Sequence, residues 1–121
     1  MSKFEAEFYE KENGEIPVEE FILSLNVKMR AKVVGIIGIL QEYGNQMREP
    51  YSKHLEDGIF EIRAIVGNDI SRVLYFFYHG GIIVLTNGFI KKSQKTPKTE
   101  IKKAKGYRKD YLERHNKNEK I

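Results

Sequence analysis

Residues 58–98 read GIFEIRAIVGNDISRVLYFFYHGGIIVLTNGFIKKSQKTPK, and this stretch decides the fold. It predicts three consecutive strands, over 58–66, 70–79 and 81–90, that lead into a basic loop. The strands are rich in Ile, Val, Phe and Tyr, which suit a half-buried pleated sheet. Val-Gly-Asn-Asp and His-Gly-Gly separate them, and both contain residues that tolerate the positive φ of a tight turn. We therefore expect a three-stranded antiparallel meander.

Charged side chains alternate with apolar ones along these strands. Because successive side chains of a strand point to opposite faces, Glu61 and Arg63 share one face of the first strand. Arg72 of the second strand joins them if the apolar faces stack on the same side, and Lys91 and Lys92 directly follow the third strand. This arrangement predicts a site for a polyanion, with an ordinary solvated sheet face as the alternative.

The sequence before the meander predicts one further strand and two helices. Residues 4–9 alternate as a strand does, and Pro17 suits the first position of a short amphipathic helix. Asn26 can cap a second helix that runs to Tyr43. Residues 45–57 are then expected to form a connecting loop.

Three glycines bear on the second predicted helix. Gly35 and Gly38 lie inside it, where each costs about 1 kcal/mol relative to alanine. Close packing against the first helix or the sheet would offset that cost. Gly44 suits the position just after the helix end.

The sequence after the meander predicts a basic helix. Thr96 can cap it and Pro97 can open it, and it is expected to run to about residue 116, with a frayed tail over 117–121. The element order β-α-α-β-β-β-α predicts an α+β fold, a mainly antiparallel sheet with two helices packed on one face. The opposite face is expected to be concave and open.

Length and composition limit the classes to which the chain belongs. Its 121 residues are expected to form one domain, over 1–121. The absence of cysteine excludes disulfides, thiolate chemistry and cysteine-based metal sites. No apolar run approaches the roughly 20 residues that span a bilayer, and the acidic N-terminus lacks the pattern of a secretory signal. A cytoplasmic protein is the simplest expectation.

The net charge of +4 is distributed unevenly. Residues 91–121 hold 12 Lys and Arg against 4 Asp and Glu, whereas residues 1–90 hold 9 against 13. A basic tail on a mildly acidic body indicates an anionic partner, with nucleic acid as the first candidate. A tail that only improves solubility is the alternative.

Three stretches together resemble the signature of HigB-type toxins. They are LEDGIFEIR at 55–63, SRVLYF at 71–76 and GFIKKSQKTP at 88–97. HigB-type toxins belong to the RelE/ParE toxin superfamily of bacterial and phage toxin–antitoxin modules. The resemblance covers nearly the whole chain, including the element order, and implies a RelE-like fold.

The resemblance also implies an activity and partners. Such toxins are small endoribonucleases (mRNA interferases) that enter the ribosomal A site and cut the mRNA there. A helix-turn-helix, HigA-like antitoxin neutralises them, and operator DNA is contacted only through that antitoxin. No cofactor, metal or membrane is expected. A ParE-like inhibitor of DNA gyrase and a non-catalytic RNA-binding domain remain alternatives, because one fold hosts all three.

The chemistry implied by the resemblance needs no metal, because the 2′-OH attacks the adjacent phosphorus and leaves a 2′,3′-cyclic phosphate. Arg72 matches the arginine that would stabilise the developing charge, and Arg63 would help. Glu61 either accepts the proton or holds Arg63 in place, and the second role is preferred. Lys91 or Lys92 would be the general acid if neighbouring cations lower its pKa, or would only bind phosphate.

Two features complete the expected site. Some relatives place His or Tyr near the end of the last strand as a proton carrier, whereas this chain has Phe89 and Ile90, so the general acid stays open. The other expected RNA contacts are Lys95, Lys98, Tyr51, Lys53 and His54.

Two experimental expectations follow from this hypothesis. Arg72→Ala is predicted to abolish growth arrest while the protein stays folded, because Arg72 is expected on the face away from the core. The antitoxin is predicted to cover acidic or apolar surface near the first helices, or to block entry to the ribosome by its bulk.

Overall fold

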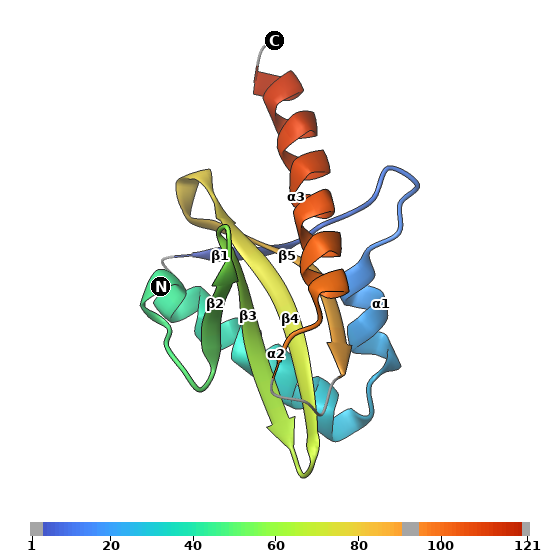
Figure 1. The fold of residues 1–121 in the computed structure, drawn as a ribbon, viewed down its shortest axis with the longest axis vertical. Coiled ribbons are helices and arrows are strands. Elements are labelled where there is room, and N and C mark those ends of the chain that lie inside the picture. The colour runs from blue at the N-terminus through green and yellow to red at the C-terminus, as the bar shows by residue number, and fades with distance from the viewer. Residues whose placement is uncertain (1–3, 91–94, 120–121) are drawn as a thin grey trace.

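The computed structural model describes residues 4–90 and 95–119. Within these ranges the chain forms five strands and three α-helices in an α+β arrangement (Figure 1). In chain order they are β1 (Glu5–Phe8), α1 (Pro17–Ser24), α2 (Val27–Tyr43), β2 (Ser52–Glu56), β3 (Ile59–Val66), β4 (Asp69–Tyr78), β5 (Ile82–Ile90) and α3 (Lys98–Glu119). Short 3-10 turns follow α2 (η1, Gly44–Gln46) and β4 (η2, His79–Gly81). None of the helices in this part of the chain is long and apolar enough to cross a membrane.

The strands join one mixed sheet in the order β1-β5-β4-β3-β2. Neighbours from β2 to β5 run antiparallel, and β1 pairs parallel to β5. The predicted meander and first strand are therefore confirmed. In the β3–β4 register Arg63 lies directly opposite Arg72, which brings two cations together on the sheet.

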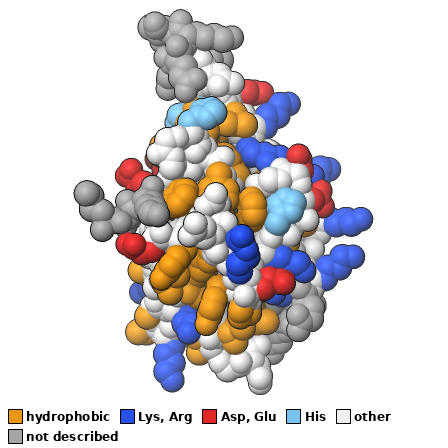
Figure 2. Space-filling view, turned by 90° about the vertical axis from the view of Figure 1, so that its left-hand side faces the viewer, with side chains coloured by type: hydrophobic (Ala, Val, Ile, Leu, Met, Phe, Trp, Pro, Cys, Tyr) orange, Lys and Arg blue, Asp and Glu red, His pale blue; other side chains and the backbone are white. Residues whose placement is uncertain are grey.

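The connecting loop predicted over 45–57 is wrong in its second half, because β2 forms there and pairs with β3. β2 is an edge strand, and most of its side chains are exposed, so it lacks apolar alternation. Asp57 and Gly58 form its turn at φ of 50° and 75°, as a two-residue type I′ hairpin requires. Figure 2 views the molecule from the side on which β2 lies.

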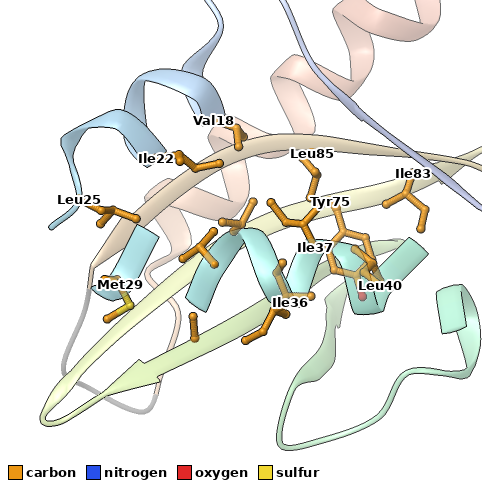
Figure 3. Packing of buried hydrophobic residues seen from close by; sticks show 14 residues of the cluster. Val18, Ile22, Leu25, Met29, Ile36, Ile37, Leu40, Tyr75, Ile83 and Leu85 are labelled. Carbon is orange, nitrogen blue, oxygen red and sulfur yellow. The ribbon is translucent and has the colours of Figure 1, made fainter. Parts of the chain in front are cut away.

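One face of the sheet packs against α1 and α2, as the sequence predicts. Figure 3 shows the buried side chains, among them Val18 and Ile22 of α1, Ile36 and Leu40 of α2, and Tyr75 and Leu85 of the sheet. The predicted cap of α2 is confirmed, because the Asn26 side chain accepts a hydrogen bond from the Met29 amide at 2.9 Å. This face holds the larger of the two apolar clusters.

The opposite face, predicted to be concave and open, is instead covered by α3 (Figure 1). Leu74 and Phe76 of β4 are buried there with Ala104 and Tyr111 of α3. The physical reason is that β4 is apolar on both faces, so both faces need cover. The helix begins one residue later than predicted and runs to Glu119, beyond the expected end near residue 116.

Ion pairs hold α3 on the sheet and along its own length. Lys105 Nζ lies 2.5 Å from Glu56 Oε2, and Arg108 Nη2 lies 2.9 Å from Asp57 Oδ2. Within the helix, Arg114 pairs with Asp110 at 2.7 Å. Part of the basic charge of residues 91–121 is therefore neutralised by carboxylates of the protein itself, and only the remainder is offered to an anionic partner.

Gly88 of β5 lies against the Phe21 ring of α1. A Cβ at Gly88 would lie 2.3 Å from a ring carbon of Phe21, so we expect Gly88→Ala to lower the free energy of unfolding by about 1–3 kcal/mol. Gly35 is the matched control. A Cβ there would meet nothing within 4 Å, so the close packing expected at this glycine is not found, and Gly35→Ala should raise stability by about 1 kcal/mol. Urea unfolding checks both, and changes of the same sign would contradict the packing.

Tyr9 couples β1 to α3 and makes stability depend on alkaline pH. Its hydroxyl donates to Asp110 Oδ2 at 2.6 Å, and its ring stacks on Tyr107. The pKa of Tyr9 is raised to about 12 from an ordinary value of about 10, mainly by burial and secondly by the Asp110 carboxylate. The stabilising effect of the neutral phenol is therefore complete below pH 10 and is lost as pH rises through 12.

We expect the free energy of unfolding to fall more steeply between pH 10 and 12 in the wild type than in Tyr9→Phe. Chemical denaturation at several pH values measures both slopes. Equal slopes in the two proteins would remove Tyr9 as the source of the pH dependence.

Candidate anion-binding site

The charged cluster predicted on β3 and β4 exists, but it is buried. The Glu61 side chain is 0% exposed and that of Arg72 is 1% exposed. Glu61 Oε2 accepts from Arg63 Nε at 2.6 Å and lies 3.4 Å from Arg72 Nη1. The carboxylate thus separates two arginines that face each other across the strand pair, where like charges alone would be destabilising.

Thr96, in the segment before α3, completes this cluster. Its hydroxyl donates to Glu61 Oε1 and accepts from Arg72 Nη1 at 3.1 Å. The sequence predicted Thr96 as a helix cap, but the Pro97 carbonyl accepts from the Ile101 amide and the helix starts at Lys98. Sequence reasoning therefore missed Thr96 as a residue of the site.

The first turn of α3 is fixed over β5 by a second polar contact. Asn87 Nδ2 donates to Glu100 Oε1 at 3.0 Å, and Asn87 Oδ1 accepts from the Thr86 hydroxyl at 2.7 Å. None of these three residues was predicted from the sequence to hold the site, because no local pattern marks them. Their effect is to hold Lys98 beside the Glu61 cluster.

A pocket of about 200 Å³ lies above this cluster, and we call it the basic pocket. Its lining includes Lys53 and His54 of β2, Arg63 of β3, Lys95 and Thr96 of the segment before α3, and Lys98 at the start of α3. Glu56 is its one carboxylate, and Glu56 is paired with Lys105. Segments far apart in the sequence thus bring together most of the predicted RNA contacts. Figure 2 shows Lys and Arg side chains gathered toward the side of the molecule that carries α3.

Other predicted site residues lie elsewhere. Arg72 does not line the basic pocket, and its expected place on an open sheet face is wrong, because it is buried and bonded to Thr96. Tyr51 is exposed and lines no described pocket, although its carbonyl accepts from the Arg63 amide at 2.9 Å. Lys91 and Lys92 lie outside the described residues.

The geometry suits the binding of an anion such as a phosphate group. Glu61 fixes Arg63 through Nε, and within the described residues the terminal guanidinium nitrogens of Arg63 have no protein partner. A guanidinium held in this way presents two donors to a phosphate. Among the described residues, Lys53 and Lys98 make no ion pair, so their positive charge adds to that of Arg63. No group of three or more side chains that could hold a metal ion is found among the described residues.

Comparison with known proteins places most of the chain in one family. Residues 20–109 match the model of the family described as phage derived protein Gp49-like (DUF891). The matched stretch runs from α1 into α3 and contains every described residue of the basic pocket. No curated protein matches the chain significantly.

Proposed function

Because this chain belongs to the phage-derived Gp49-like family, a toxin-like family of the RelE superfamily, we propose that it is the toxin of a type II toxin–antitoxin module. We propose further that it is a HigB-type, ribosome-dependent endoribonuclease that cuts translated mRNA in the cytoplasm. The observation that carries this second step is the basic pocket. Its cations surround a space of about 200 Å³, which accommodates one phosphate group with its sugar.

The proposed cleavage begins with attack of a ribose 2′-OH on the adjacent phosphorus, and the hydroxyl proton passes to a water molecule. The phosphorane that forms carries extra negative charge on its equatorial oxygens. Arg63 faces that charge with its terminal nitrogens, and Lys53 and Lys98 neutralise the rest. The P–O5′ bond then breaks, the departing oxygen takes a proton, and a 2′,3′-cyclic phosphate remains.

His54 joins Lys91 and Lys92 as a candidate for the general acid. Its Nε2 accepts a hydrogen bond from the Gly58 amide at 3.2 Å. A neutral imidazole is a poor acid, so we propose that His54 donates from the doubly protonated ring, after Nε2 has released the Gly58 amide. His54 lines the basic pocket, beside the proposed position of the phosphate. This assignment supplies the proton carrier that the end of β5 lacks.

Glu61 and Arg72 are proposed as positioning residues. The Glu61 carboxylate accepts from Arg63, Arg72 and Thr96, so protein donors take up most of its lone pairs. A carboxylate in that state is suited to holding Arg63 and poorly placed to take a proton from RNA. Arg72 in turn holds Glu61 and Thr96 together, and we propose Arg63 for the direct phosphate contact.

Induction in bacteria followed by primer extension on an abundant transcript tests the activity. New cuts confined to the translated region, and absent from an untranslated copy of the same transcript, are the expected result. Growth arrest without cuts would favour the gyrase inhibitor, which has no need of a phosphate-sized cationic pocket. If neither growth arrest nor cuts are observed, a non-catalytic RNA-binding domain is the remaining alternative.

Exposed apolar side chains on the first helices support the predicted position of the antitoxin. Leu23 of α1 and Val27 and Val34 of α2 are all exposed, although each is large and apolar. We expect the antitoxin to cover them, so that Val27→Lys with Val34→Lys weakens the purified toxin–antitoxin complex. Isothermal titration checks the affinity, and an unchanged Kd would move the antitoxin to another surface.

A further inference from the structure

A second pocket, of about 490 Å³, lies on the opposite face of the sheet from the basic pocket, and the proposed cleavage does not use it. It is formed by the segment after α2, by β2 and by the exposed ends of β3 and β4. Its side chains include Met47, Arg48, Lys53, His54, Phe60 and Phe77. We call it the aromatic pocket. Figure 2, which faces the β2 side, shows hydrophobic side chains reaching the surface beside charged ones.

The wall of the aromatic pocket is a set of packed rings. Phe60 stacks on Tyr75 with centroids 5.5 Å apart, and Phe77 and His54 each meet Phe60 edge-on. The Tyr75 hydroxyl shares a buried hydrogen bond of 2.6 Å with Ser52. The polar atoms at the base of the wall are therefore satisfied within the protein, and the rings face the pocket as an apolar surface.

The lining of the pocket carries two cations, Arg48 and Lys53, and one carboxylate, Glu49. Arg48 Nη1 donates to the Asn45 carbonyl at 2.9 Å and to the Met47 carbonyl at 3.2 Å, which holds the guanidinium in place. Its other nitrogens have no partner among residues 4–90 and 95–119, and the same holds for the Lys53 ammonium. A ring wall below two cations fits a ligand that joins a planar ring to an anionic group.

We propose that the aromatic pocket binds one nucleotide, with its base against Phe60 and Phe77 and its phosphate between Arg48 and Lys53. Stacking on aromatic side chains is the usual way in which proteins hold an unpaired base. The volume of about 490 Å³ lies within the range of small-ligand sites.

The position of the pocket indicates where the nucleotide comes from. Lys53 and His54 line both pockets, so the two sites meet at β2. An RNA strand with its scissile phosphate in the basic pocket would pass over this edge and place a neighbouring nucleotide in the aromatic pocket. This assignment to RNA rests on the proposed function, whereas the nucleotide site itself does not, and a free nucleotide is the other source.

Nuclear magnetic resonance with the four nucleoside monophosphates tests the site, and inorganic phosphate is the matched control. We expect each nucleotide to shift the Met47 methyl and the ring resonances of Phe60 and Phe77. Inorganic phosphate should leave those rings unchanged. Identical shifts for nucleotides and phosphate, or none in the rings, would overturn the proposal.

Variants then test the source of the nucleotide with a short 2′-O-methyl RNA, which cannot be cleaved. Phe60→Leu and Arg48→Gln are each expected to weaken its binding about fivefold or more, because the first removes a base contact and the second a phosphate contact. Tyr43→Leu changes an exposed aromatic residue that lines neither pocket and should bind as the wild type does. Arg48 is exposed, so Arg48→Gln still gives an answer if Phe60→Leu fails to fold.

The outcomes separate this inference from the proposed function. If nucleotides shift the ring resonances but the protein cuts no mRNA, the aromatic pocket is still a nucleotide site, and its ligand is a free nucleotide. Normal RNA binding by both variants, with cuts in translated mRNA intact, would overturn the RNA assignment and leave the nuclease standing.

Discussion

Replacing Glu61 by alanine is expected to lower the free energy of unfolding by about 3–5 kcal/mol, the cost of leaving a buried charge without its partner. Glu61 is fully buried and accepts hydrogen bonds from Arg63, Arg72 and Thr96. Its removal leaves the Arg72 guanidinium in the interior without the carboxylate that neutralises it. Urea unfolding of the wild type and the variant measures the loss.

Glu56→Ala is the matched control for this change. Glu56 also pairs with a cation, but its side chain is 51% exposed, so water and ions replace the lost partner. We expect a change below about 1 kcal/mol. Equal losses of unfolding free energy in Glu56→Ala and Glu61→Ala would show that burial of the carboxylate does not determine the size of the loss.

A double replacement separates stability from positioning. Glu61→Leu with Arg72→Met removes both buried charges together, and such swaps for apolar residues are often neutral or stabilising. The double variant should therefore regain most of the stability that Glu61→Ala loses. It would still fail to hold Arg63, so a stable but inactive protein is expected.

Arg63→Gln is expected to reduce cleavage of translated mRNA by about 10²–10³-fold, the usual effect of removing one donor to a developing oxyanion. Arg63 lines the basic pocket and bonds Glu61 through Nε, which leaves its terminal nitrogens for a ligand. Glutamine keeps the side chain polar but removes the charge and the paired donors. Quantitative primer extension, with the amount of folded protein checked in parallel, measures the effect.

Arg108→Gln provides the comparison for Arg63→Gln. The two arginines are similarly exposed, at 15% and 20%, and each pairs with one carboxylate, Glu61 of β3 for Arg63 and Asp57 of the β2–β3 turn for Arg108. Arg108 lies outside the basic pocket. Its replacement changes only a charge away from the proposed phosphate position, so cleavage should stay within about twofold of the wild type. A comparable loss of cleavage in both variants would mean that general positive charge, rather than the pocket, carries the activity.

The structure changes the interpretation of Arg72→Ala. The sequence predicted a folded and inactive variant, because Arg72 was expected on an open face. Arg72 is instead buried against Glu61 and Thr96, so its removal disturbs the support of Arg63. Loss of growth arrest in Arg72→Ala would therefore not establish a direct contact with RNA.

The sequence predicted the elements that repeat a strong pattern and missed those that depend on tertiary contacts. Asn26 as a cap and the meander from 58 to 90 could be predicted because capping and alternation are local signals. β2 was missed because an edge strand with exposed side chains has no alternation. The Asp57-Gly58 pair is a hairpin signal that would have located its turn.

The same contrast holds for the site. Alternation alone placed Glu61, Arg63 and Arg72 on one face, and that placement is confirmed. Their burial could not be predicted, because it depends on where α3 packs after a segment with no helical or strand pattern. Leu74 and Phe76 on the face of Arg72 were the available warning that this face needs cover.

The parallel pairing of β1 with β5 has a consequence for synthesis of the protein. Glu5 pairs with Ile82, so an early segment must wait for one of the last strands before the sheet can close. Arg63 and Lys98 likewise meet only after α3 has emerged from the exit tunnel. A nascent chain therefore carries no assembled basic pocket until α3 has left the tunnel. The delay also leaves unpaired strand edges exposed, where nascent chains aggregate most readily.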